Sequence, residues 1–158
     1  MNQKMTNTDI LRILDHLILI NNDRIDGYEK ARQQCQQKYP DLQILFDEMI
    51  ELSFENKKEL EDAVENSGGE LSINTTIAGK IHRVWMDIDA VLSGFDKHAL
   101  LANCEAGENA AMKAYHDAMS ENFPSPVCDM IQVQQQRLIS AYNKIKYLRI
   151  DKHIRETK

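Results

Sequence analysis

Paired carboxylates are the residues of this chain whose spacing could support chemistry. Glu48 and Glu51 stand three residues apart, and so do Glu105 and Glu108. A third acidic row repeats every three residues: Asp23, Asp26 and Glu29. Side chains three or four residues apart share one face of a helix, so each row would present its carboxylates together. Carboxylates from several helices of a bundle can hold divalent cations such as iron or manganese.

The complete ligand set of such a site is missing from the sequence. A di-iron site in a helical bundle takes Glu-x-x-His from two of its helices, and this chain contains no Glu-x-x-His. Between Asp129 and Asp151 there is no acidic residue at all, so one helix would contribute no carboxylate. We therefore expect no metal and no cofactor. Glu48, Glu105 and Glu108 remain the candidates for an iron or manganese ion held by an atypical carboxylate site.

Other catalytic groups are scattered. The five histidines do not cluster along the chain: His16, His82, His98, His116 and His153. Cys35 and Cys104 lie on apolar rows and are expected to be small buried side chains, whereas Cys128 is expected to be accessible. The sequence contains no glycine-rich phosphate loop, no Gly-x-Ser-x-Gly elbow and no His-Glu-x-x-His. We expect no catalytic residue, and a non-enzymatic protein is favoured over an enzyme.

Composition limits the class of protein. The chain has 158 residues, a length typical of one domain, with only 6 glycines, 3 prolines and 6% aromatic residues. A net charge of −6 disfavours nucleic acid as a partner. No apolar run is long enough to cross a membrane, and no leader-like segment begins the sequence. We expect a single cytoplasmic helical domain over 1–158, without membrane insertion and with frayed ends at about 1–7 and 153–158.

Apolar residues recur at steps of three and four through most of the chain, the period of amphipathic helices. This spacing predicts five helices, of which the third is short: about 8–38, Pro40 to the Ser67-Gly68-Gly69 break, 76–92, 96–121 and 125–152. Gly27 falls inside the first helix, where glycine costs about 1 kcal/mol relative to alanine. Either a neighbouring helix packs closely against Gly27, or the flaw is tolerated.

Two helical hairpins joined by a long connection predict an all-α, four-helix bundle with one crossover that carries a short extra helix. Polar residues lie on the inward rows at mid-height: Asn21, Arg24, Asn56, Glu108, and Gln135 or its neighbour Gln134. Because an unpaired buried charge is costly, Arg24 should pair with Glu108 or Glu105. Such a layer either fixes the register of the helices or is a former ligand site in which Arg24 replaces a cation.

Aromatic residues complete the predicted interior. Tyr28, Tyr115 and Tyr142 lie on inward rows, where their hydroxyl groups could reach the polar layer. Trp85 belongs to the short crossover helix. We expect it to plug one end or side of the bundle, although a tryptophan next to Arg83 could also anchor a protein partner.

Three segments carry a resemblance to known proteins: residues 21–31 (NNDRIDGYEKA), 79–87 (GKIHRVWMD) and 104–111 (CEAGENAA), followed by Ala114-Tyr115. Their order and spacing resemble an uncharacterised bacterial family of ferritin-like four-helix-bundle proteins. The resemblance extends over about residues 8–150. It implies the fold of that superfamily and supplies no agreed biochemical activity.

These observations lead to two hypotheses about function. The first is a non-enzymatic bundle that self-associates, as a homodimer, or binds a protein partner; a link to stress rests on superfamily analogy. The second is a metal-dependent oxidase or iron-handling protein that uses an atypical carboxylate site.

Overall fold

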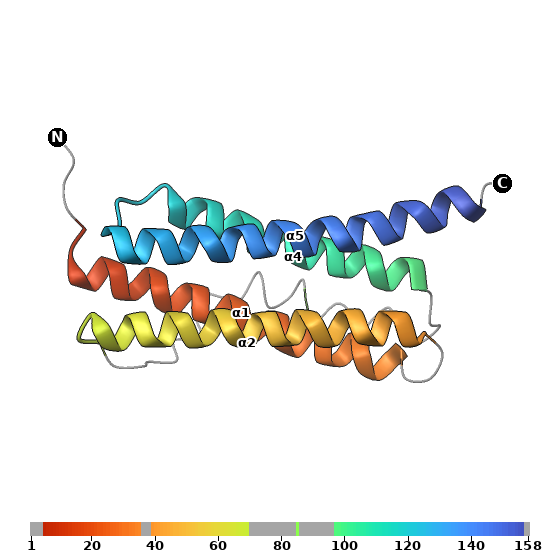
Figure 1. Ribbon diagram of the computed structural model, residues 1–158, viewed down its shortest axis with the longest axis horizontal. Helices are drawn as coiled ribbons and strands as arrows, with labels where there is room; N and C mark the ends of the chain where they lie inside the picture. The colour runs from red at the N-terminus through yellow and green to blue at the C-terminus, as the bar shows by residue number, and fades with distance from the viewer. Residues whose placement is uncertain (1–4, 36–38, 70–84, 86–96, 157–158) are drawn as a thin grey trace.

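The computed structural model describes residues 5–35, 39–69, 85 and 97–156. Within these residues the elements are all helices: α1 (Asn7–Cys35), α2 (Pro40–Asn66), α4 (Lys97–Met119) and α5 (Ser125–Glu156), shown in Figure 1. The predicted all-α, four-helix class is confirmed. The short helix expected at 76–92 lies outside the described residues except for Trp85, which is helical. None of the helices described is both long and apolar enough to cross a membrane.

Local sequence signals explain where the helices begin and end. Thr6 caps α1, because its Oγ1 accepts a hydrogen bond from the backbone N–H of Asp9 at 3.2 Å. Pro40 opens α2, where a missing N–H costs nothing. Gly68 closes α2 with a φ of 78°, and the N–H of Gly69 bonds back into the last turn. At the other end of the chain, α5 continues to Glu156, further than the expected end at 152.

The helices run in alternating directions around the bundle (Figure 1). The side chain of Asn7 bonds the carbonyl oxygen of Ser67 at 2.7 Å, so α1 begins where α2 ends. Lys97 lies 3.7 Å from Asp41, so α4 begins at the opposite end of the bundle, beside the start of α2. The end of α2 and the start of α4 therefore lie at opposite ends of the bundle, and α4 runs parallel to α2.

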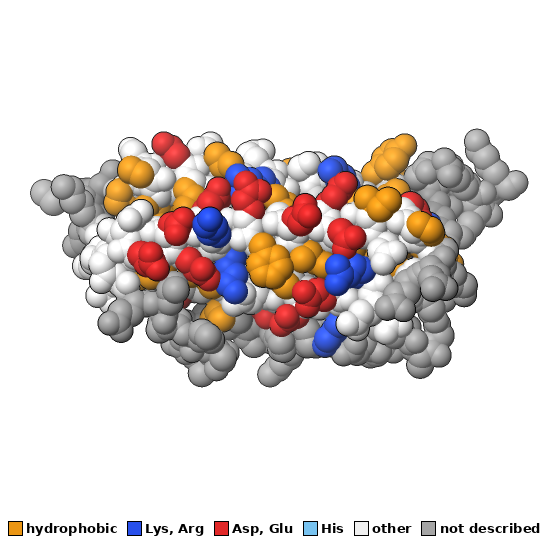
Figure 2. All heavy atoms as spheres, turned by 60° about the horizontal axis from the view of Figure 1, so that its bottom comes forward, with side chains coloured by type: hydrophobic (Ala, Val, Ile, Leu, Met, Phe, Trp, Pro, Cys, Tyr) orange, Lys and Arg blue, Asp and Glu red, His pale blue; other side chains and the backbone are white. Residues whose placement is uncertain are grey.

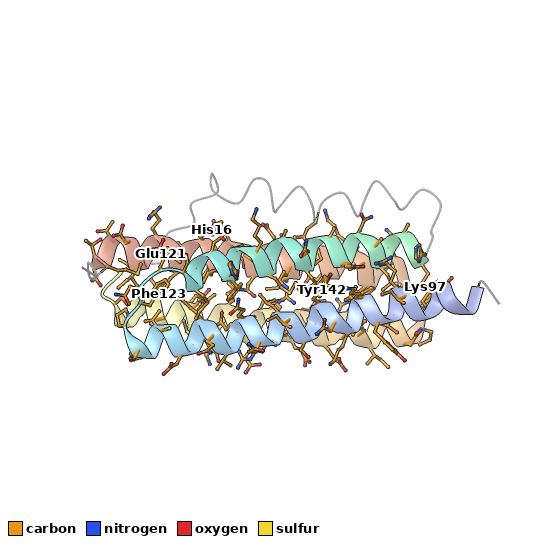
Figure 3. The ribbon with its side chains drawn as sticks, turned by 90° about the horizontal axis from the view of Figure 1, so that it is seen from above. His16, Lys97, Glu121, Phe123 and Tyr142 are labelled. Atoms are coloured by element: carbon orange, nitrogen blue, oxygen red, sulfur yellow. The ribbon has the colours of Figure 1, made fainter. Side chains whose placement is uncertain are left out.

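Two apolar clusters fill the interior, one towards each end of the bundle. The first contains Tyr28, Phe46, Leu100 and Ile145, and the second contains Leu14, Leu60, Tyr115 and Leu138. Phe123, in the connection between α4 and α5, is only 7% exposed and closes the second cluster (Figure 3). Between the two clusters lie buried polar side chains from all four described helices: Asn21, Arg24, Ser53, Asn56, Glu108 and Gln134. The hydrophobic core is thus divided by a polar layer.

Trp85 packs against one side of the bundle and explains two helical glycines. A Cβ placed on Gly27 of α1 would lie 2.3 Å from Cε3 of Trp85. A Cβ on Gly107 of α4 would lie 2.5 Å from Cε2 of the same indole ring. Both glycines therefore leave room for the ring, which has no solvent exposure. Gly27 marks a close approach, and the packing partner is the indole of Trp85.

Candidate functional site

The centre of the polar layer is an ion pair between α1 and α4. The Nη2 of Arg24 lies 2.7 Å from Oε1 of Glu108, and neither side chain is exposed. The Nη1 of Arg24 donates to Oγ of Ser53 on α2 at 2.9 Å. The hydroxyl group of Tyr28, one turn after Arg24, donates to the same Glu108 oxygen. A buried carboxylate is thus held by one guanidinium and one phenol.

Burial and mutual attraction decide the charge states of these groups. Burial by itself would lower the pKa of the Arg24 guanidinium, but the attraction of Glu108 outweighs it and the pKa is raised. Burial raises the pKa of Tyr28 well above its usual range, and the negative charge of Glu108 raises it further. Arg24 therefore remains a cation and Tyr28 remains a hydrogen-bond donor at neutral pH.

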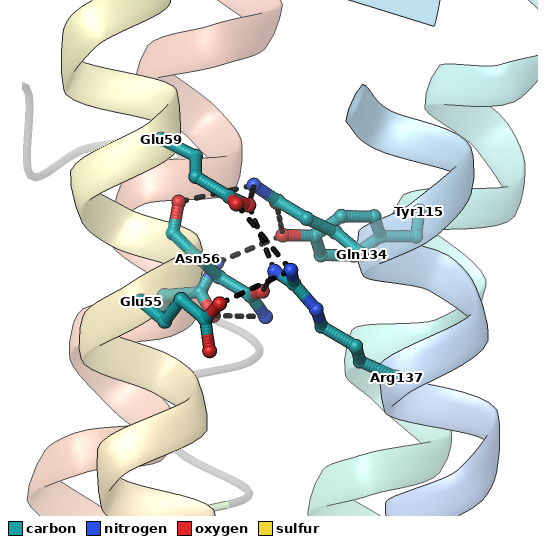
Figure 4. Close-up of polar contacts among 7 residues, drawn as sticks. Glu55, Asn56, Glu59, Tyr115, Gln134 and Arg137 are labelled. Atoms are coloured by element: carbon teal, nitrogen blue, oxygen red, sulfur yellow. Dashed lines mark hydrogen bonds and ion pairs between the residues drawn. The ribbon is translucent and has the colours of Figure 1, made fainter. Parts of the chain in front are cut away.

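A second network of buried polar groups lies beside the ion pair and takes one residue from each described helix (Figure 4). The Nδ2 of Asn21 donates to the Tyr115 hydroxyl at 2.9 Å, and that hydroxyl donates to Oε1 of Gln134 at 2.6 Å. The Nε2 of Gln134 donates to the backbone carbonyl of Asn56 at 3.1 Å. The Nδ2 of Asn56 returns to Oδ1 of Asn21 at 3.3 Å. These hydrogen bonds close a ring across the bundle.

Arg137 connects this ring to the surface between α2 and α5. Its Nη1 donates to Oδ1 of Asn56 at 2.9 Å and to Oε1 of Glu59 at 2.8 Å. Its Nη2 lies 3.2 Å from Oε1 of Glu55. The hydrogen bond to Glu59 is the main cause of the raised pKa of Arg137. Among the contacts described, this is the side on which the polar layer continues from the buried ring to solvent.

Four of the residues that the sequence predicts for the polar layer lie in it. Asn21, Arg24, Asn56 and Glu108 are all without solvent exposure and take part in the two networks. Of the two glutamines considered on α5, Gln134 is the one that faces inward, whereas Gln135 is only partly buried and does not belong to the layer. Neighbouring residues on a helix point about 100° apart, so a small rotation of α5 decides which of the two faces inward.

Ser53, Glu59 and Arg137 belong to the networks and were missed by sequence reasoning. Ser53 stands three residues before Asn56 and Arg137 three residues after Gln134, so helical spacing would have placed each near the layer. Serine and arginine are also common on helix surfaces, so spacing alone does not assign them to a buried layer. Glu59 lies in a run of alternating charges that is typical of a solvated face.

Each of the three candidate metal ligands has a basic neighbour of its own. Glu108 binds Arg24, whereas Glu105 binds Arg149, whose Nη2 lies 3.3 Å from its Oε1. Glu48 is exposed on α2, with Lys144 at 3.8 Å. Within the described part of the chain, no three histidine, cysteine or acidic side chains come close enough to hold a metal ion. The residues present therefore do not fit a carboxylate-bridged iron or manganese centre.

The cysteines and the histidines of the described residues form no second cluster of reactive groups. Cys35 and Cys104 are fully buried, and Cys128 is partly exposed. Burial raises the pKa of Cys35 to about 11, so its thiol stays protonated and unreactive at neutral pH. Burial lowers the pKa of His16, which therefore stays neutral at pH 7. His116 is exposed, next to Asp117.

The fold and the site define a four-helix bundle whose centre is a buried ion pair beside a ring of three amide side chains and the Tyr115 hydroxyl. The family model described as Domain of unknown function (DUF2383) matches residues 9–121, from the first turn of α1 to just beyond α4. The chain belongs to this family, and the expected membership of an uncharacterised family is confirmed. No curated protein matches the chain. Gln134 and Arg137 on α5 lie beyond the matched segment.

Proposed function

We propose that this protein is a non-catalytic, ferritin-like bundle that acts by associating with itself or with a protein partner. The observation that carries the proposal is the buried pair of Arg24 and Glu108. Glu108 is the most deeply buried of the candidate metal ligands, and its Oε1 already accepts hydrogen bonds from Arg24 and Tyr28. These two donors supply the positive charge and the contacts that a metal ion would otherwise provide.

The charge of Arg24 makes a cation at this position unfavourable. A divalent ion bound to Glu108 would lie within about 4 Å of the guanidinium. At an effective dielectric constant of about 20, their repulsion would cost about 8 kcal/mol. The other side chains that hydrogen-bond to this pair, Ser53 and Tyr28, are uncharged hydroxyls, so they cannot offset that repulsion.

The arrangement of the helices supports the ferritin-like part of the proposal. In ferritin-like folds, two antiparallel hairpins are joined by one long crossover, so that the second and third long helices run parallel. The directions of α1, α2, α4 and α5 agree with this arrangement (Figure 1). In this protein the helices of that arrangement surround a guanidinium. A physiological link to stress follows from superfamily analogy alone.

Metal analysis and iron oxidation test the non-catalytic part. Protein purified without chelators should contain no stoichiometric iron or manganese, and ferrous iron should oxidise in air at the same rate with and without it. Glu108→Gln removes the buried carboxylate, and Glu121→Gln, on an exposed residue, is the matched control. If iron binding or oxygen-dependent oxidation is found, and Glu108→Gln abolishes it while Glu121→Gln does not, the protein is a metal-dependent oxidase or iron-handling protein.

Light scattering tests the association part. A mass above that of one chain, 18.2 kDa, is expected for the wild-type protein or for its complex with a partner. Because this measurement is independent of metal content, the two parts of the proposal can fail separately.

A further inference from the structure

The face formed by α2 and α5 is not covered by either of the other two described helices. Each of these helices packs mainly against its hairpin partner, and a shallow groove runs between them, lined at mid-length by Met49, Leu52 and Ala141. On the opposite side, Trp85 lies in its notch between α1 and α4. The face of α2 and α5 also carries three of the large exposed apolar side chains of the described residues: Ile44 at 62%, Val133 at 51% and Tyr147 at 68% exposure.

At mid-length the two walls of the groove have opposite charge, whereas nearer one end Asp62 of α2 and Asp129 of α5 are both acidic. Acidic residues Glu48, Glu55 and Glu59 line the α2 wall, and basic residues Arg137 and Lys144 line the α5 wall. Lys144 lies 3.8 Å from Glu48, and Nη1 of Arg137 lies 2.8 Å from Glu59, so the acidic and basic positions are level along the bundle. Figure 2 shows acidic and basic side chains interspersed with apolar ones on a side of the molecule that includes α2.

We propose that this face binds the same face of a second copy of the chain, around a two-fold axis parallel to the bundle. The inference rests on the proposed function, because it names the partner and the surface for self-association. A two-fold axis along the groove places α2 of one copy over α5 of the other at the same height, acid over base. An axis across the groove would place α2 over α2, and like charges would meet. Charge complementarity therefore selects the first arrangement.

The exposed apolar residues fit the same arrangement. Ile44 precedes Glu48 by one turn on α2, and Tyr147 follows Lys144 by one turn on α5. Because α2 and α5 are antiparallel and Glu48 is level with Lys144, Ile44 and Tyr147 are also level with each other. Around the proposed axis, Ile44 of each copy faces Tyr147 of the other. Two exposed side chains on each copy are thereby buried in apolar contacts.

The area of the face suits a stable dimer. Helix α2 has 27 residues, so the face is about 40 Å long. Two adjacent helices are about 20 Å wide, which gives about 800 Å² for each partner. This is the area that each partner typically buries in a specific protein interface.

A charge-swap experiment tests the interface and its symmetry. Glu48→Lys places lysine opposite Lys144 of the second copy, and Lys144→Glu places glutamate opposite Glu48. Each variant alone should lose self-association by roughly tenfold or more, because the like-charge contact occurs twice around the axis. A mixture of the two variants should form heterodimers with an affinity near that of the wild type. Analytical ultracentrifugation measures the masses and dissociation constants.

Apolar variants give a second, independent measurement. Ile44→Ser and Tyr147→Ser should each weaken the dimer. Phe54→Ser is the matched control: Phe54 is 49% exposed but lies two turns after Asp47, whose carboxylate faces Arg32 of α1, so it points away from the groove. This control variant should dimerise like the wild type.

The outcomes separate the interface from the proposed function. A wild-type dimer that none of the groove variants weakens would refute this face and leave self-association standing. A monomeric wild-type protein would refute both the interface and self-association. If each charge variant alone is monomeric but the mixture stays monomeric too, the two-fold arrangement is wrong.

Discussion

Replacing Arg24 by methionine tests the central ion pair most directly. The variant keeps an unbranched side chain but leaves Glu108, which has no solvent exposure, without its counter-charge. The carboxyl group can avoid a buried charge by taking up a proton. At pH 7, protonating a carboxyl whose pKa in the unfolded chain is about 4.3 costs about 3.7 kcal/mol. We therefore expect Arg24→Met to lower the free energy of unfolding by about 4 kcal/mol, within the range observed when one partner of a buried pair is removed.

The expected loss of unfolding free energy in Arg24→Met also depends on pH. In the variant, the folded protein binds one proton more than the unfolded chain at pH 7. Stability then falls as the pH rises, because the unfolded chain releases this proton and the folded protein does not. The deficit should therefore shrink from about 4 kcal/mol at pH 7 to about 1 kcal/mol at pH 5.

Urea denaturation followed by circular dichroism at pH 5, 6 and 7 measures both quantities. Arg12→Met on the same helix is the matched control, because Arg12 is exposed and its nearest carboxylate is 3.7 Å away; it should change stability by less than about 0.5 kcal/mol. Adding Glu108→Gln to Arg24→Met removes the titrating carboxyl and should remove the pH dependence. A deficit below about 1 kcal/mol at pH 7, or one that is equal at pH 5, would refute the reasoning.

Three further predictions concern the glycine notch, the buried ring and the thiols. Gly107→Ala should lower the melting temperature, although alanine favours helices by about 1 kcal/mol, because the new Cβ would lie 2.5 Å from the Trp85 ring; a higher melting temperature would contradict the notch. Tyr115→Phe should cost about 1–3 kcal/mol in urea denaturation, since its hydroxyl joins two buried amides. Tyr142→Phe, whose hydroxyl makes one bond of 3.5 Å, should cost less, and equal losses would refute the ring. In the native protein a thiol reagent should modify Cys128 first and the two buried cysteines only on unfolding; three equally fast thiols would contradict their burial.

The sequence predicted the helical class because the apolar period and the helix breakers are local signals. Pro40 and Gly68 set the limits of α2 through their own backbone preferences, whatever packs around them. The start of α1 was less sharply defined: Thr6 makes the capping bond and the helix begins at Asn7, one residue before the expected start at about 8. Threonine and aspartate occur three times within four residues there, and only the observed bond identifies the cap.

The sequence also predicted which polar side chains of the first three long helices face inward. Asn21, Arg24 and Glu108 stand in rows that are otherwise apolar, and a charge in such a row needs a partner. The geometry places the guanidinium of Arg24 on Glu108, while Glu105, the other acceptor considered, binds Arg149. Three residues of helix separate the two glutamates, and the spacing alone could not choose between them.

Spacing along the chain therefore determined the helices and most of the residues that face inward, because the helical period of about 3.6 residues returns every third or fourth residue to the same face. Tertiary packing decided the rest. Whether Gln134 or Gln135 enters the layer depends on how α5 is rotated against its neighbours. Trp85 packs between Gly27 and Gly107, and Arg137 bonds to residues of α2. Both contacts join residues that are far apart in the sequence. Such contacts exist only once the helices have packed, because no local preference encodes the distance between them.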